Sequence, residues 1–430
     1  MNLIVAMIVL SILILVHELG HFLVAKWCGI RVLEFSMFMG PKLFAFTKGE
    51  TKYTLRLIPM GGYVKMEGEE TTSDDPRAFN RQKVWKRFLV VSAGPAMNVV
   101  LAFVLMTAYI LSTGVMTNRI LEFGDNSPFP AAGIKTGDRL VSWNGRAIHD
   151  LSTDVNLFLY NADDKPVDIG WTDASGSRHD AEILLAKTTP TYRLGFSVTM
   201  VDDKASNIID VVEPNSPLEK AGLKRGDVIV LIDGQETKNR EDIVNWLNGG
   251  RGEGNPPVTL TVHRGDASLI FRDITPFMDS RYTIDADFVI EHPGLWGALG
   301  GAWNYSASTI RMVLTTVGWL FTGQVSFAEV SGPVGIVGTI GSVVEREPTL
   351  ADKLLSLASL GAMLSLNLGV MNLIPFPALD GSKLALLLIE KIRRRPLPPE
   401  KEGLISLIGF SLVILLLVAT LINDIPRWRL

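Results

Sequence analysis

The sequence predicts an α-helical polytopic membrane protein with four transmembrane helices and an inserted soluble region. Two observations lead to this fold class. Apolar residues make up 47% of the 430-residue chain and gather in runs long enough to cross a bilayer. Between these runs, residues 118–282 contain short alternating segments separated by Gly, Pro, Asn and Asp, which is typical of soluble β-rich domains.

The four predicted spans differ in kind. Two contain no charged residue and are interpreted as plain anchors, at 88–117 and 404–422. The other two, at 1–27 and 354–389, are interrupted by ionisable residues, which cost several kcal/mol in a membrane unless they have a partner or a cavity. The first run lacks the basic start and the cleavage site of a secretory signal, so we expect a retained helix.

Lysine and arginine predict the orientation of the spans. The segment 28–87 holds eleven of them, and 390–403 is also basic, so both are expected in the cytosol. The middle region and the tail 423–430 are then external. A net charge of -4, spread along the chain, does not indicate nucleic-acid binding. The single cysteine, Cys28, excludes an internal disulfide and is interpreted as a packing residue.

The first interrupted span carries the pattern HExxH at residues 17–21. Two histidines four residues apart lie about 40° apart on one helix face, so His17 and His21 can bind one zinc ion. Glu18 is close enough to take a proton from a water molecule on that metal. The alternative is that both histidines only face lipid headgroups or pack against neighbouring helices.

The second interrupted span offers a third ligand. Its segment MNLIPFPALDGSK, residues 371–383, contains two prolines and a glycine that should unwind the helix. Irregular backbone at membrane depth is tolerated where protein or a cavity satisfies it. Asp380 in this break is therefore a candidate to reach the histidine pair. The alternative is that the segment ends a helix at the membrane surface.

The soluble region contains an internal repeat. Residues 126–145 align without gaps to 215–234, and ten of the twenty positions are identical. Each copy predicts a short helix closed by Gly133 or Gly222, a Gly-Asp turn, a strand and a tight Asn-Gly or Asp-Gly turn. The unit resembles the PDZ domain, which implies two inserted α+β domains at 118–200 and 201–282. The segment YRLGF then resembles a peptide-binding loop, with Leu194, Gly195 and Phe196 as binding residues. Inert spacer domains are the alternative.

Three features together resemble the bacterial site-2 protease family over essentially the whole chain. They are HELGH in a first span, NLIPFPALDG in a late span, and the tandem PDZ-like units between them. The resemblance implies a zinc enzyme with ligands His17, His21 and Asp380 and the catalytic base Glu18. It also implies that Asn372, Pro375 and Pro377 shape a substrate-facing break.

Further segments fit the same family. Residues 56–66, RLIPMGGYVKM, resemble its membrane-reentrant β-hairpin, which is proposed to present substrate as an added strand. Gly61 and Gly62 would permit the turn, with Tyr63 beside them. Two positions depart from the family pattern: Met39 stands where a glycine is usual, and the usual Asp-Gly-Gly-His is Asp380-Gly381-Ser382-Lys383 here. The segment 283–353, with its Trp-rich stretch 295–321, is expected on the external membrane face.

By this resemblance, the protein would be an inner-membrane endopeptidase with its active site near the cytosolic side. Its substrates would be single-span proteins such as anti-sigma factors, already trimmed by an upstream site-1 protease, and remnant signal peptides. The PDZ pair would exclude untrimmed proteins by size. Two other classes stay open: a membrane-anchored PDZ scaffold with a vestigial metal site, and a metal transporter. Glu18 argues against both, because neither binding nor transport needs a base there.

Overall fold

The computed structural model describes residues 2–69, 73–201, 204–213, 216–249, 256–325, 332–395 and 399–427. Outside the described residues lie Asn215 of the repeat, the separate residue Ser331, and residues 428–430 of the predicted tail. The chain divides into two compact units, each considered by itself below. One unit comprises Met1–Asn118, Ala147–Leu157 and Phe288–Asp424, and the other comprises Arg119–Arg146, Phe158–Asp287 and Ile425–Leu430.

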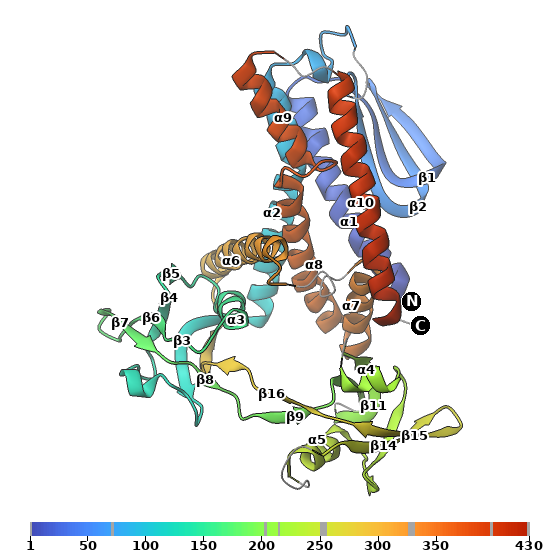
Figure 1. Cartoon of the computed structure of the whole chain (residues 1–430). Coiled ribbons are helices and arrows are strands. Elements are labelled where there is room, and N and C mark those ends of the chain that lie inside the picture. Colours follow the sequence, from blue (N-terminus) through green and yellow to red (C-terminus); the bar gives the residue numbers. More distant parts are fainter. Residues whose placement is uncertain are drawn as a thin grey trace. The chain divides into compact units, whose positions relative to one another are not determined.

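Among the residues that the structure describes, four helices are long and apolar enough to cross a membrane, in agreement with the four predicted spans. They are α1 (Asn2–Trp27), α2 (Val84–Thr113), α8 (Leu350–Leu373) and α10 (Pro399–Arg427). In Figure 1, α1, α2 and α8 run beside one another, and α2 packs against both of the others. The same unit contains η1 (Phe79–Arg81), α6 (Leu295–Thr322), α7 (Pro333–Arg346) and α9 (Asp380–Arg393).

Small residues bring α2, α6 and α8 close together. Ala102 of α2, Ala298 and Ala302 of α6 and Ala362 of α8 are fully buried in one cluster. Without a large hydrophobic driving force between helices in lipid, close backbone approach through small residues is a main source of packing energy. This packing fixes the position of α2, which lies against the part of α1 that carries His17 and His21.

The predicted break in the third span is present between α8 and α9. Residues 374–379 are not helical, and Ala378 has a φ of 79°. Pro375 and Pro377 lack the N–H that a helix needs, which explains why the helix stops here. Glycine at position 409 lets α10 approach the break, because a Cβ there would lie 2.3 Å from the Cβ of Pro377. The helix resumes at Asp380.

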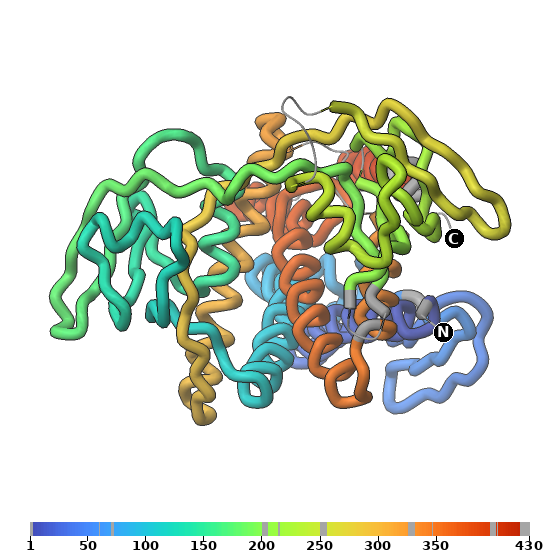
Figure 2. Tube along the Cα trace, turned by 90° about the horizontal axis from the view of Figure 1, so that it is seen from below, coloured from blue at the N-terminus to red at the C-terminus, as the bar shows by residue number. Residues whose placement is uncertain are grey.

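Strands β1 (Val32–Lys48) and β2 (Thr51–Met66) form an antiparallel hairpin that curls into four paired segments. Phe35 in the first half of β1 pairs with Tyr53 on one side and with Val64 on the other. The segments therefore lie in the order 44–48, 51–56, 32–37 and 62–66. The last segment is an edge that no other described strand covers. Figures 1 and 2 both show the hairpin beside α1, against which β2 packs.

The hairpin turn lies at Gly49 and Glu50, not at Gly61 and Gly62 as the sequence suggested. Gly49 has a φ of 63°, which suits a tight turn. Gly61, with a φ of 74°, bends β2 where the chain crosses from one side of residues 32–37 to the other. The glycine pair thus starts the edge segment rather than reversing the chain.

The middle of the chain is rich in strands, consistent with an inserted PDZ-like domain. One sheet has the order β18-β3-β4-β6-β7, with β5 beside β4, and a second has the order β10-β11-β12-β14-β15, with β13 beside β12. Two short pairs, β8 with β17 and β9 with β16, complete the pairing.

The first sheet and its connections contain β3 (Val115–Phe123), η2 (Pro130–Ala132), β4 (Arg139–Trp143), β5 (Arg146–Ala147), α3 (Leu151–Tyr160), β6 (Val167–Thr172), β7 (Arg178–Ile183), β8 (Ala186–Lys187) and β18 (Ala286–Glu291). The second contains β9 (Thr191–Arg193), β10 (Phe196–Val201), β11 (Lys204–Val212), α4 (Pro217–Ala221), β12 (Val228–Ile232), β13 (Gln235–Glu236), α5 (Arg240–Gly249), β14 (Val258–Arg264), β15 (Ala267–Ile274), β16 (Phe277–Asp279) and β17 (Tyr282–Thr283).

The two repeat copies adopt the same local conformations. Gly133 and Gly222 both cap a helical turn in the left-handed conformation, with a φ of 86°. Both residues of the Asn144-Gly145 pair have a positive φ, and so have both of the Asp233-Gly234 pair, as the predicted tight turn requires. The first helical turn is a 3-10 helix and the second is α-helical. Spacing and turn residues were therefore sufficient to predict these features.

Candidate metal centre

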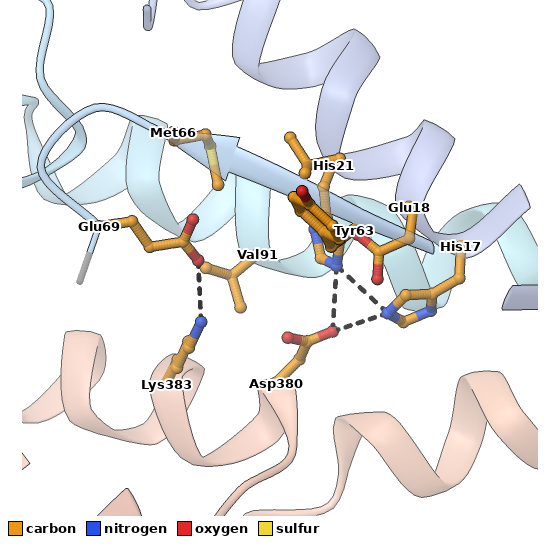
Figure 3. A pocket seen from close by; sticks show the side chains of 10 residues that line it. His17, Glu18, His21, Tyr63, Met66, Glu69, Val91, Asp380 and Lys383 are labelled. Atoms are coloured by element: carbon orange, nitrogen blue, oxygen red, sulfur yellow. Dashed lines mark hydrogen bonds and ion pairs between the residues drawn. The ribbon is translucent and has the colours of Figure 1, made fainter. Parts of the chain in front are cut away.

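Residues from both ends of the chain meet beside α1. His17, Glu18 and His21 lie on the part of α1 that faces α2, β2 and α9 (Figure 3). Asp380 is the first residue of α9, directly after the broken segment. Because the helix ends before Pro375 and restarts at Asp380, the aspartate projects into the bundle from a helix N-terminus, where the dipole favours a negative charge.

The three predicted metal ligands form a nearly equilateral triangle of ligand atoms. Oδ2 of Asp380 lies 3.1 Å from Nε2 of His17 and 3.3 Å from Nε2 of His21. The two Nε2 atoms are 3.2 Å apart. A tetrahedral zinc ion with bonds of about 2.0–2.1 Å holds its ligand atoms about 3.3 Å apart. The donor set and its spacing therefore fit zinc, with a fourth position open toward the pocket.

The helix α2 contributes to this centre, although the sequence suggested only a plain anchor. The backbone carbonyl of Val90 accepts a hydrogen bond from Nδ1 of His21 at 2.8 Å, and the side-chain amide of Asn98 lies 3.1 Å from Nδ1 of His17. Gly94 lies between them, where a Cβ would be 2.3 Å from Nε2 of His21. The signal was a Gly-Pro pair and an asparagine inside an otherwise apolar span.

A pocket of about 200 Å³ opens on the ligand atoms, with room for several water molecules. Lys383 of α9 forms an ion pair with Glu69, 3.0 Å long, across this pocket (Figure 3). In the sequence, Lys383 stood out only as a departure from the usual Asp-Gly-Gly-His motif, and no signal pointed to Glu69. The lining residues are His17, Glu18, His21, Tyr63, Val64, Met66, Glu69, Val91, Asp380 and Lys383.

The edge segment of β2 forms one wall of the pocket. Val64 of this segment lines the pocket together with Glu18. A Cβ at Gly62 would lie 3.8 Å from Cγ of Glu18, so this part of the strand passes directly over the glutamate. Two contacts hold the Tyr63 side chain in place: its hydroxyl donates to Glu34 at 2.9 Å and lies 2.6 Å from Nη2 of Arg56.

Other predicted site residues do not line the pocket. Asn372 is at the end of α8, and Pro375 and Pro377 are in the break that follows. Leu194 and Phe196 belong to the second sheet, and their side chains are buried in its core. Gly195, between them, is also buried and has a φ of 78°.

The arrangement suits hydrolysis. It combines three candidate metal ligands with one further carboxylate, Glu18, in a pocket with room for water. In the part of the chain that the structure describes, this is the one group of three histidine, cysteine or acidic side chains close enough to share a metal ion. Metal, base and water in one site are the components of a metallohydrolase.

The chain is similar to known proteins over nearly its whole length. The model of peptidase family M50 matches residues 5–416. The chain belongs to this family. It is similar to zinc metalloprotease RasP of Shouchella clausii, with 31% identity over 99% of this chain and 99% of the relative. It is also similar to regulator of sigma-E protease RseP of Escherichia coli, with 31% identity over 98% of this chain and 97% of the relative.

As a member of peptidase family M50 with four apolar helices, the protein is a site-2-type, zinc-dependent intramembrane protease of the inner membrane. A PDZ domain of HtrA3 bound to a phage-derived ligand was also found among solved structures. It covers 22% of this chain and 92% of its own, at 22% identity. The TM-score of this match is 0.17.

Proposed function

We propose that His17, His21 and Asp380 hold the zinc ion of this protease and that Glu18 is its general base. The observation that carries the proposal is the triangle of ligand atoms with sides of 3.1, 3.2 and 3.3 Å. Glu18 lines the same pocket but has no such contact with Asp380, which leaves its carboxylate for proton transfer.

In this mechanism, Glu18 takes a proton from the attacking water and later donates it to the leaving amine. A zinc ion would polarise the scissile carbonyl and lower the pKa of water toward about 7. Glu18 lines the pocket beside Val64 of the edge segment, so the base faces the space where water and substrate would meet. The apolar helices around the site limit water to the pocket, which strengthens each electrostatic interaction inside it.

We further propose that substrate adds as a strand to residues 62–66 of β2. This segment is an uncovered sheet edge and forms a wall of the pocket, so an added strand would pass beside Glu18. Gly61 and Gly62 would start the segment that pairs with substrate, and Tyr63, which lines the pocket, would contact the added chain. Asn372, Pro375 and Pro377, around the break before Asp380, would shape the opposite side of the path.

The substrates we propose are single-span membrane proteins of the anti-sigma type, trimmed beforehand by a site-1 protease, and remnant signal peptides. The name of the Escherichia coli relative, a regulator of sigma-E, supports the first class. The active site would lie near the cytosolic side. Two PDZ domains, at about 118–200 and 201–282, would stand outside, exclude untrimmed proteins by size and offer the backbone at Leu194, Gly195 and Phe196 to a peptide end.

Helix α6 is proposed to rest on the external membrane surface. Its small residues face the bundle, while Trp296, Trp303 and Phe321 are 84%, 69% and 82% exposed. Tryptophan favours the interface between lipid and water, which an amphipathic helix occupies. The β1–β2 hairpin is proposed to be membrane-reentrant, because it exposes a comparable set of apolar side chains, among them Leu43, Phe44, Phe46 and Leu57.

A cleavage assay with metal analysis tests the catalytic assignment. Purified wild-type protein and Glu18→Gln are incubated with a single-span reporter, and zinc per chain is measured. We expect the variant to keep its zinc and to cleave at least about 100-fold more slowly, because general acid–base catalysis typically contributes that much or more. Glu122→Gln, which changes an exposed carboxylate on β3, is the matched control and should cleave normally. A zinc-loaded Glu18→Gln that cleaves at the wild-type rate contradicts the proposal.

A further inference from the structure

The two histidines of the metal centre are held by different kinds of partner. Nδ1 of His21 faces the backbone carbonyl of Val90, which can only accept a hydrogen bond. In the neutral ring the proton of His21 therefore lies on Nδ1, and its Nε2 offers a lone pair. Nδ1 of His17 faces the side-chain amide of Asn98, which can donate through its nitrogen or accept through its oxygen.

Asn98 is fixed in position but not in the orientation of its amide. Its side chain is fully buried, and its backbone carbonyl accepts a hydrogen bond of 2.8 Å from Ser365 of α8. Gly369 packs directly against it, because a Cβ there would lie 3.3 Å from Cβ of Asn98. The amide oxygen, however, has no hydrogen-bond partner among the described residues. His17 is thus the group that determines which end of the amide faces it.

The metal changes what His17 requires from this partner. Without metal, Nε2 of His17 can donate its proton to Asp380 at 3.1 Å, while Nδ1 accepts from the Asn98 amide nitrogen. As a metal ligand, Nε2 must be unprotonated, so the proton of the neutral ring lies on Nδ1 and needs an acceptor. The change moves one proton from Nε2 to Nδ1, through exchange with pocket water, and leaves the charge of the ring unchanged.

We propose that Asn98 is a positioning residue for the metal ligand His17, and that its amide turns by half a rotation when metal binds. In the turned state, the amide oxygen accepts from Nδ1–H of His17 and holds Nε2 toward Asp380 and His21. An amide serves both states without charge, whereas a carboxylate would have to be buried in an apolar bundle. The inference rests on the proposed role of His17 as a ligand.

Zinc affinity tests the proposal with two substitutions of similar size. Asn98→Leu removes the acceptor, and Asn98→Asp keeps it. With purified full-length protein and a competing chelator, we expect Asn98→Leu to bind zinc about 10- to 100-fold more weakly, which is the usual cost of losing such a partner. Asn98→Asp should stay within about threefold of the wild type or bind more tightly, since a carboxylate is a strong acceptor for a ligand histidine.

Two controls separate this role from packing and from the proposed function. Thr107→Val changes a buried residue of the same helix, whose hydroxyl bonds only to Phe103 of its own helix, and should leave zinc affinity unchanged. His17→Ala should lose zinc. If His17→Ala binds zinc normally, the proposed ligand set is wrong. If His17→Ala loses zinc while Asn98→Leu binds normally, or if Asn98→Asp and Asn98→Leu weaken binding equally, the role of Asn98 alone is wrong.

A measurement on the wild type keeps the proposal testable even if a variant does not fold. In ¹⁵N-histidine NMR spectra, protonated and unprotonated ring nitrogens differ strongly in chemical shift, and His17 is assigned by comparison with His17→Ala. We expect Nδ1 of His17 to be unprotonated in zinc-free protein and protonated after zinc is added. Nδ1 that is already protonated without zinc would overturn the amide rotation.

Discussion

At the scale of single residues, the centre depends on a position without a side chain. Gly94 brings α2 against both imidazoles: a Cβ there would lie 2.3 Å from Nε2 of His21 and 2.8 Å from Nε2 of His17. Contacts this short cannot form, so Gly94→Ala must displace both rings. A displacement of about 1 Å at a catalytic centre can cost about 100-fold in rate. We expect Gly94→Ala to lose zinc and cleavage together, measured by metal analysis and by the reporter assay.

The control for Gly94→Ala is another helical glycine with free space around it. A Cβ added at Gly318 in α6 would meet no atom within 4 Å, so Gly318→Ala should keep zinc and activity. Alanine also favours the helix over glycine by about 1 kcal/mol, so general destabilisation through helix propensity is not expected in either variant. Normal zinc content in Gly94→Ala would show that the rings have room that the structure denies them.

The residues that the sequence predicted and those that it missed differ in one physical respect. His17, Glu18 and His21 share one helix, and their spacing alone places them together. Asp380 was predicted because a break in an apolar span needs a reason. Gly94 and Asn98 act from another helix, and their contacts depend on how α2 is rotated about its axis. Helical periodicity gives a lipid-exposed span little to fix that rotation.

Among the elements, the β1–β2 hairpin has its turn at Gly49 and Glu50, whereas the sequence placed a turn at Gly61 and Gly62. A glycine pair predicted a turn at Gly61, but Gly61 lies within the 16-residue strand β2, which pairs with both sides of residues 34–37 and so needs a bend there rather than a reversal. Local turn preferences do not record which of two edges a strand will pair with. The bend places residues 62–66 at the wall of the pocket.

Helix α3 begins with a buried carboxylate that joins it to α6. Asp154 is fully buried and accepts hydrogen bonds from the N–H of His149 at 2.8 Å and from Oγ of Ser308 at 2.7 Å. It also pairs with Arg311 at 3.2 Å. Removing one partner of a buried pair typically costs about 3 kcal/mol. Asp154→Ala should therefore speed hydrogen exchange in the first turn of α3 by roughly 100-fold.

The matched control is Asp163→Ala, which removes an exposed pair with Lys165 just beyond the same helix. Exposed pairs contribute about 0–1 kcal/mol, so exchange in α3 should change little. If both variants exchange at the wild-type rate, the carboxylate does not hold α3 to α6.

For the whole molecule, apolar runs predicted the spans and an internal alignment predicted the repeat. The limits of the third predicted span differ from those in the structure. The apolar run 354–389 consists of α8, which ends at Leu373, and α9, which begins at Asp380. An apolar run does not by itself show where α8 ends, and the prolines before Asp380 mark the boundary. The orientation of the spans stays a prediction from Lys and Arg.

That orientation can be measured, because the chain has one cysteine and Cys28 is buried. In a Cys28→Ser background, Ser175→Cys places a thiol before β7, and Asp74→Cys places one at a side chain that is 97% exposed between β2 and α2. The positive-inside bias of residues 28–87 puts the second site in the cytosol. A membrane-impermeant maleimide should label Ser175→Cys in intact spheroplasts and Asp74→Cys only after permeabilisation, while Cys28→Ser alone should stay unlabelled. The reverse pattern would place the metal centre nearer the external side, because α1 joins the centre directly to the segment that carries Asp74.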